Sequence, residues 1–218
     1  MEKRILFKNR KEAGVMLAHE LYSSKNNFDL VLAIPRGGLP LGAIIAKQLH
    51  LPLDVVLTKK IGSRYNKEYA IGALSLTGRI LESESGFEET EYIESETKRI
   101  RKLLEERDRK YHKTASRHEV KDKKVILVDD GIATGNTMLA TVDLIHRAGA
   151  SQITLAIPVA PSSTIDKLSS SSHIDKVVCL YEPKPFYAIG EFYKDFSPVS
   201  DEEAITILEK AGFMSSIP

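Results

Sequence analysis

Short apolar runs alternate with stretches of helical character along most of this chain, and that alternation limits the possible folds more than any other feature. Buried strands are predicted at residues 30–34, 54–58, 124–128, 153–159 and 176–181. Helices are expected between them, where apolar residues recur at three- and four-residue steps. Strands that alternate with helices pair in parallel through right-handed crossovers. The expected fold class is therefore α/β, with a mostly parallel sheet flanked by helices.

One domain is expected to account for the whole chain. The chain has 218 residues, of which 42% are hydrophobic, and this is enough to bury one substantial core. No internal repeat or linker-like stretch divides it, so residues 1–218 are predicted to form a single domain. A short hairpin at residues 74–81 and a long helix at residues 88–111 are expected as additions. The basic half of that helix could bind nucleic acid, but interleaved acidic residues and few aromatic ones favour a solvated face.

Composition limits the classes of binding partner and the cellular compartment expected for the protein. The formal net charge is +1, so no strong field favours nucleic acid or an anionic membrane as a partner. No segment is long and apolar enough to span a bilayer, and the first residues lack an apolar signal core. The single cysteine, Cys179, can form no disulfide within the chain, which fits the reducing cytoplasm. Cys179 could act as a nucleophile, but a buried strand thiol is the better interpretation.

The strongest local signal lies at residues 125–137. An apolar strand delivers two adjacent carboxylates, Asp129 and Asp130, to its carboxyl end, and a loop with glycines and threonines then opens a helix. Such a loop can direct several backbone N–H groups at one phosphate. The carboxylates would repel a bare phosphate, but they suit sugar hydroxyls or a metal bound through water. These parts predict a ribose 5-phosphate cradle; the alternative is an ordinary strand–helix turn with an Asp cap.

A second loop follows the strand at residues 30–34 and carries Arg36, Gly37 and Gly38. Its backbone amides and the Arg36 guanidinium could hold a pyrophosphate. A tight turn from strand to helix would explain the two glycines equally well.

The segment VILVDDGIATGNTM closely resembles the signature with which type I phosphoribosyltransferases bind 5-phosphoribosyl-1-pyrophosphate (PRPP). The resemblance implies the type I core with a small variable hood, and contacts from Asp129 and Asp130 to the ribose hydroxyls. It implies pyrophosphate binding by the Arg36 loop, where the family often has a cis peptide bond that does not involve proline. The residues implied in binding the 5-phosphate are Ile132, Ala133, Thr134, Gly135, Asn136 and Thr137.

Two neighbouring lysines follow the strand at residues 54–58. The family places a basic residue here, near the pyrophosphate, so the resemblance implies this role for Lys60 and, beside it, for Lys59. Residues 61–69 are polar and contain glycine, and we expect them to form a loop that closes over the site. The alternative is a pair of solvated lysines beside a passive loop.

Aromatic residues gather near the carboxyl-terminal end of the chain. Members of the family carry a variable hood that binds the acceptor base, often by stacking, so residues 183–200 are a candidate hood and Tyr187 is a candidate base-binding residue. The alternative is packing of this segment on the core, because clustered rings mostly bury area. The aromatic residues of this segment are Phe186, Tyr187, Phe192, Tyr193 and Phe196.

The resemblance implies a pentosyltransferase of nucleoside metabolism, which transfers the 5-phosphoribosyl group to a nitrogen of a nucleobase-like acceptor and releases pyrophosphate. Arg36, Lys60, Asp129 and Asp130 are the expected catalytic residues, with Mg²⁺ bound through PRPP and without direct protein ligands. The chain is also similar to a bacterial subgroup of phosphoribosyltransferases with no assigned acceptor, and its loop argues against orotate. Related enzymes are often homodimers. The alternatives are a PRPP-sensing regulatory protein with little or no catalysis and a hydrolase of a related sugar phosphate.

Overall fold

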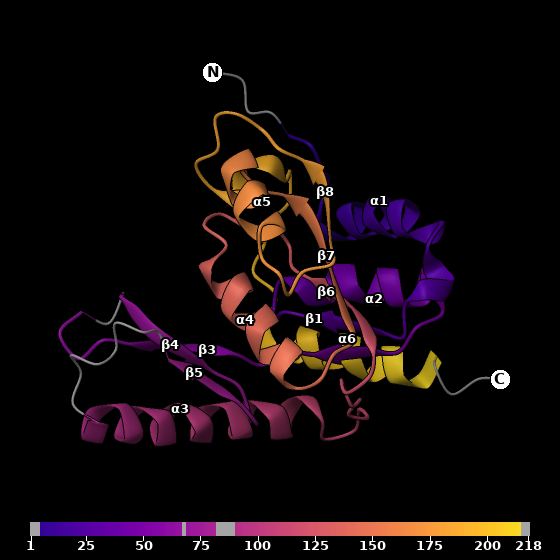
Figure 1. The fold of residues 1–218 in the computed structure, drawn as a ribbon. Helices are drawn as coiled ribbons and strands as arrows, with labels where there is room; N and C mark the ends of the chain where they lie inside the picture. The colour runs from indigo at the N-terminus through magenta and orange to yellow at the C-terminus, as the bar shows by residue number, and fades with distance from the viewer. Residues whose placement is uncertain (1–4, 67–68, 82–89, 215–218) are drawn as a thin grey trace.

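A five-stranded parallel sheet forms the centre of the molecule (Figure 1). The computed structural model describes residues 5–66, 69–81 and 90–214. The strands stand in the order β2-β1-β6-β7-β8, and each is parallel to its neighbours. Their bounds are Leu30–Ala33 for β1, Leu53–Val55 for β2, Lys124–Val128 for β6, Gln152–Val159 for β7 and Lys176–Tyr181 for β8. The predicted α/β class is confirmed.

Helices cover both faces of this sheet (Figure 1). On one face lie α1 (Arg10–Tyr22) and α2 (Gly38–Leu49), with the short 3-10 turn η1 (Lys25–Asn27) before β1; on the other lie α4 (Asn136–Arg147) and α5 (Ser162–Ser169). Alternate side chains of β1 enter the two cores, Val31 and Ala33 the first, Leu30 and Leu32 the second. Because both faces are buried, the strands are continuous apolar runs in the sequence.

A separate antiparallel sheet stands beside the central one, built from β3 (Lys59–Gly62), β4 (Ala70–Leu74) and β5 (Arg79–Leu81), with α3 (Thr90–Tyr111) packed on it (Figure 1). The hairpin expected at residues 74–81 is present as β4 and β5, but its first strand begins earlier, at Ala70. The loop predicted from residue 61 starts later, because Ile61 pairs with Gly72 and is fully buried. One apolar residue in a polar stretch is too weak a sequence signal for a strand. Residues 67–68 and 88–89 of the predicted loop and helix lie outside the described residues.

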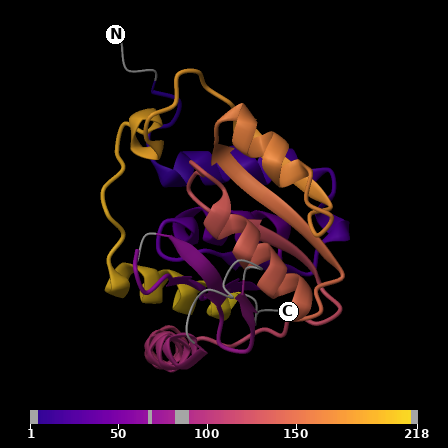
Figure 2. The same ribbon diagram turned by 60° about the vertical axis from the view of Figure 1, so that its left-hand side comes forward.

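The carboxyl-terminal part of the chain forms the 3-10 turn η3 (Ile189–Phe192) and then α6 (Asp201–Met214), which packs beside α2 and α3 (Figure 2). We did not predict α6, although the sequence carries its signal. Ser200 begins a Ser-x-x-Glu capping box, and its Oγ accepts a hydrogen bond from the N–H of Glu203 at 3.1 Å. Ala204 and Leu208, four residues apart, are buried. None of the described helices is both long and apolar enough to cross a bilayer.

Candidate active site

The two loops singled out in the sequence meet at the carboxyl ends of adjacent strands. Ala33 of β1 is in register with Val128 of β6, and the N–H of Ile34 donates to the Val128 carbonyl at 2.9 Å. The chain leaves β1 toward β2 on one side and leaves β6 toward β7 on the other. This is the topological switch point where open α/β sheets bind their ligands.

Contact between the loops explains the two glycines after Arg36. A Cβ atom at Gly37 would lie 2.1 Å from Oδ2 of Asp130, and one at Gly38 would lie 2.5 Å from the carbonyl oxygen of Val128. Close approach to the second loop therefore excludes side chains here, and a tight turn is not the whole explanation. The peptide bond between Pro35 and Arg36 is cis, the conformation that the resemblance implied.

The loop before α4 presents a row of backbone donors. Gly135 occupies the N-cap position with φ 76°, and no side chain caps the helix. Within the described parts of the chain, the amides of residues 133–137 donate to no protein acceptor, and neither do those of Arg36 and Gly37. The amide of Ile132 differs, because it donates to the Val159 carbonyl at 3.0 Å. Ile132 therefore anchors the loop, whereas the amides of residues 133–137 have the arrangement that suits an anion.

The adjacent carboxylates stand in a partly desolvated environment. Burial, reinforced by the charge of Asp130, raises the pKa of Asp129 well above its ordinary value. Burial also raises the pKa of Asp130, although Arg10 opposes the shift. Arg10 Nε donates to Asp130 Oδ2 at 2.8 Å, and the two side chains are only 12% and 13% exposed. Burial thus disfavours the charged forms of both carboxyls, and hydroxyl donors or a cation would stabilise those forms.

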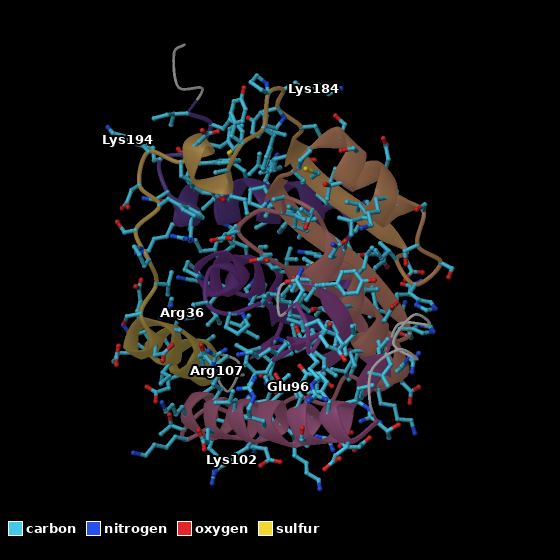
Figure 3. The ribbon with its side chains drawn as sticks, turned by 90° about the vertical axis from the view of Figure 1, so that its left-hand side faces the viewer. Arg36, Glu96, Lys102, Arg107, Lys184 and Lys194 are labelled. Atoms are coloured by element: carbon cyan, nitrogen blue, oxygen red, sulfur yellow. The ribbon has the colours of Figure 1, made fainter. Side chains whose placement is uncertain are left out.

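The Arg36 guanidinium lies at the start of α6. Its Nη1 is 3.5 Å from Asp201 Oδ1, and both side chains are about half exposed. Figure 3 shows Arg36 beside α6, with Arg107 of α3 close to it. An exposed pair of this kind contributes only about 0–1 kcal/mol, so it would not hold Arg36 against an anion in the loop. Lys59 and Lys60 are neighbours in β3, so their side chains point to opposite faces of the small sheet.

Residues 7–182 match the phosphoribosyl transferase domain. The chain belongs to this family. The predicted membership in the type I phosphoribosyltransferases is confirmed, and the match spans both loops and the two lysines of β3. It ends before the aromatic segment at residues 186–196.

Known members of the family extend this result. Two sequences from Mycobacterium tuberculosis strains, provisionally named as phosphoribosyl transferases, are each 32% identical to the chain over 211 residues. These alignments cover 94% of the chain and 47% of each relative, so the chain spans about half their length. The crystal structure of TT1426 from Thermus thermophilus is similar with a TM-score of 0.86 and 33% identity, over 95% of this chain and 100% of that one.

The candidate hood contacts the candidate site through aromatic residues other than Tyr187. The Tyr193 hydroxyl donates to the Asp130 carbonyl at 2.7 Å, and the Arg10 guanidinium lies 3.8 Å from the centre of the Phe196 ring. Phe192 and Tyr193 are 4% exposed, so packing on the core explains them. Tyr187 is 73% exposed. Lys184 and Lys194 lie on the outer surface of the same segment (Figure 3).

Sequence reasoning missed Arg10, and it noted Tyr193 only as one of the clustered aromatic residues. A signal for Arg10 was available: it is a cation in the first turn of α1, where the helix dipole disfavours positive charge. The aromatic cluster did not indicate the contact of Tyr193 with Asp130, because only the tertiary fold brings its hydroxyl to the loop after β6. For Cys179, burial raises the pKa of the thiol to about 11. The thiol stays protonated, which supports a structural role and not a nucleophilic one.

Proposed function

We propose that this domain binds PRPP and transfers its 5-phosphoribosyl group to a nitrogen of a nucleobase-like acceptor, with release of pyrophosphate. One observation carries the proposal: two loops, whose amides at residues 36–37 and 133–137 donate to no acceptor among the described residues, converge on two carboxylates, of which Asp130 is buried. A ligand with an anionic group at each end and a polyhydroxylated group in the middle would satisfy the amides of both loops and the two carboxylates between them.

The parts of PRPP are assigned by chemistry. The 5-phosphate is placed at residues 133–137, against the amides and the amino-terminal end of α4. The ribose hydroxyls donate to Asp129 and Asp130, whose charge needs such donors. The pyrophosphate is held by the amides of Arg36 and Gly37 and by the side chains of Arg36 and Lys60, with Lys59 as the alternative lysine.

In the reaction, the bond from C1′ to the pyrophosphate oxygen breaks, and a bond from C1′ to the acceptor nitrogen forms. Positive charge develops on the ribose ring as the leaving group departs with the bonding electrons. Asp129 and Asp130 lie where they would stabilise that charge, and Arg36 and Lys60 would stabilise the charge on pyrophosphate. Asp129 and Asp130, two carboxyls with raised pKa values, could hold a Mg²⁺ ion bound to PRPP through water molecules. When bound, Mg²⁺ would polarise the leaving pyrophosphate.

Arg10 is proposed as a positioning residue for Asp130. Its fork geometry bridges Asp130 and the Ser197 carbonyl, both at 2.8 Å. This arrangement favours the ionised form of the carboxylate, against the effect of burial, and orients it toward Gly37.

The acceptor base is proposed to bind at residues 183–200, with Tyr187 as its stacking partner. The exposed ring of Tyr187 supports this choice, because it is the aromatic side chain of the segment least used in packing. Tyr187→Ala should then raise KM for the base and leave PRPP affinity unchanged. A loss of thermal stability with unchanged KM would make Tyr187 a packing residue.

A PRPP-sensing regulator is the second candidate, and the Arg36–Asp201 pair favours it. In a sensor, PRPP would draw Arg36 away from α6 and so report its presence. The two functions separate in one experiment, in which pyrophosphate release is measured with PRPP, Mg²⁺ and a panel of bases, alongside calorimetric binding of PRPP. Turnover with any base supports the transferase. Tight PRPP binding without turnover supports the sensor, and absence of binding rejects both.

A further inference from the structure

A second concave site lies away from the two phosphate loops. A cavity of about 570 Å³ opens between β2, the turn at residues 75–78, the last turns of α4 and residues 117–121 before β6. The loop at residues 131–137 stands at the opposite end of α4, which is about 18 Å long at 1.5 Å per residue. The cavity is therefore separate from the site of the proposed reaction.

The interior of this cavity is apolar. Its volume falls in the range of small-molecule sites, which bury most of an organic ligand against apolar side chains. Leu144 and Ile145 are almost fully buried in the protein. The apolar lining residues include Leu32, Val56, Leu57, Leu76, Leu144 and Ile145.

One wall of the cavity is a satisfied polar network. His112 Nε2 lies 2.8 Å from Asp54 Oδ1, and His112 Nδ1 lies 2.8 Å from Asp108 Oδ1. Arg117 pairs with Asp108, and the N–H of His118 donates to Asp54 Oδ2 at 2.7 Å. Both ring nitrogens of His112 face carboxylates, and although burial lowers the pKa of the ring, their hydrogen bond and charges raise it overall. Asp54 and Asp108 are each paired within this wall, which limits their repulsion of an anion.

The mouth of the cavity carries cations. Lys121 and Arg147 line it, and within the described ranges neither forms an ion pair. The stem of Lys121 packs over Gly149, just beyond α4. Glu119 is the acidic residue at the mouth that no described cation pairs with. Together with the outer face of Arg117, the mouth favours an anionic head group.

We propose that this cavity is a second ligand site, for an organic anion whose aromatic or acyl body enters the apolar interior. Its carboxylate, phosphate or sulfonate head binds Lys121 and Arg147. The site is independent of whether the domain transfers a phosphoribosyl group.

The test uses two fluorescent probes of similar shape, 8-anilino-1-naphthalenesulfonate, which has an anionic head, and N-phenyl-1-naphthylamine, which has none. The sulfonate should bind saturably to the folded protein. The double variant Lys121→Glu/Arg147→Glu should weaken the sulfonate at least tenfold and the neutral probe less than twofold. The control Lys123→Glu/Lys124→Glu changes the net charge equally, at exposed lysines that do not line the cavity, and should leave both affinities unchanged.

Amide chemical shifts locate the bound sulfonate. Perturbations at residues 75–78, 117–121 and 144–148 support the site, whereas perturbations confined to residues 131–137 overturn it. The proposal is also overturned if the control weakens the sulfonate as much as the mouth variant does, or if no saturable binding occurs. PRPP affinity, measured without probe, should be equal in both double variants; a wild-type protein that binds no PRPP would count against the proposed function alone.

Discussion

Removing the charge of Arg10 should cost both stability and the affinity for PRPP. Arg10→Met keeps the length of the side chain and its contact with Phe196, but it deletes the hydrogen bonds to Asp130 and Ser197, both 2.8 Å long. Because the Arg10 and Asp130 side chains are only 12% and 13% exposed, the variant leaves a buried carboxylate without its cationic partner. Breaking such a pair costs about 3–5 kcal/mol. That is a large part of the roughly 5–15 kcal/mol by which a domain is stable.

The functional consequence follows from the pKa of Asp130. Arg10 opposes the rise that burial imposes on this carboxyl, so its loss should raise the pKa of Asp130 further. As the pH falls, Arg10→Met should lose PRPP affinity at a higher pH than the wild type, because the ionised carboxylate is the acceptor for the ribose hydroxyls. Arg10→Lys keeps a cation and should restore most of the pH profile.

Urea denaturation and calorimetric PRPP titrations from pH 5 to 8 measure both effects. The double variant Arg10→Met/Asp130→Asn closes a double-mutant cycle, and it should be more stable than Arg10→Met because no charge is stranded. If Arg10→Met is destabilised but binds PRPP with the wild-type pH profile, Arg10 has only a structural role. If the double variant is less stable than Arg10→Met, the stranded charge is not the cause of the loss.

Three further predictions test the site and its surroundings. Asp129→Asn should stabilise the unliganded protein at neutral pH, because burial raises the pKa of Asp129, and it should lower the affinity for PRPP at least tenfold. The gain in the urea midpoint should shrink as the pH falls through that raised pKa toward about 4. An equal or lower midpoint at pH 7 would contradict this prediction. Gly38→Ala should lower the free energy of unfolding by about 1–3 kcal/mol and also lower the affinity for PRPP, because the new Cβ would lie 2.5 Å from the Val128 carbonyl oxygen. Gly42→Ala, whose Cβ would lie 3.1 Å from side chains, should cost less stability. The reverse order in urea denaturation would refute the role of the close approach. For His112, burial lowers the pKa, but the hydrogen bond and charge of Asp54 and the charge of Asp108 outweigh it and raise the pKa overall. The free energy of unfolding should therefore fall as the pH rises from about 6.5 through the raised pKa. His112→Gln should flatten this part of the pH profile, and parallel profiles for the variant and the wild type would exclude His112 as the titrating group.

The sequence by itself determined the features that depend on neighbouring residues. Nearly continuous apolar runs predicted the strands of the parallel sheet, because strands buried on both faces carry few polar side chains. The second strand is shorter than predicted, because β2 covers Leu53–Val55 and not residues 54–58. The run from Val125 through Thr137 predicted a phosphate loop at a strand end, since glycines, hydroxyls and a helix start are encoded within a few residues. The start of α4 after this loop and the turn after β1 followed from the same local rules.

Tertiary structure alone decided which distant groups meet. Arg10 and Asp130 are 120 residues apart, and only the packing of α1 against the central sheet brings them within 2.8 Å. Gly37 is explained by the Asp130 carboxylate, and Ile61 by its partner in β4, which its polar neighbours do not reveal. Asp54, Asp108 and His112 likewise form one network only because the fold brings His112, just after α3, within 2.8 Å of Asp54 on β2. Local propensity follows from short-range sterics and hydrogen bonds, whereas burial, pKa shifts and cavities depend on which surfaces the whole chain brings together.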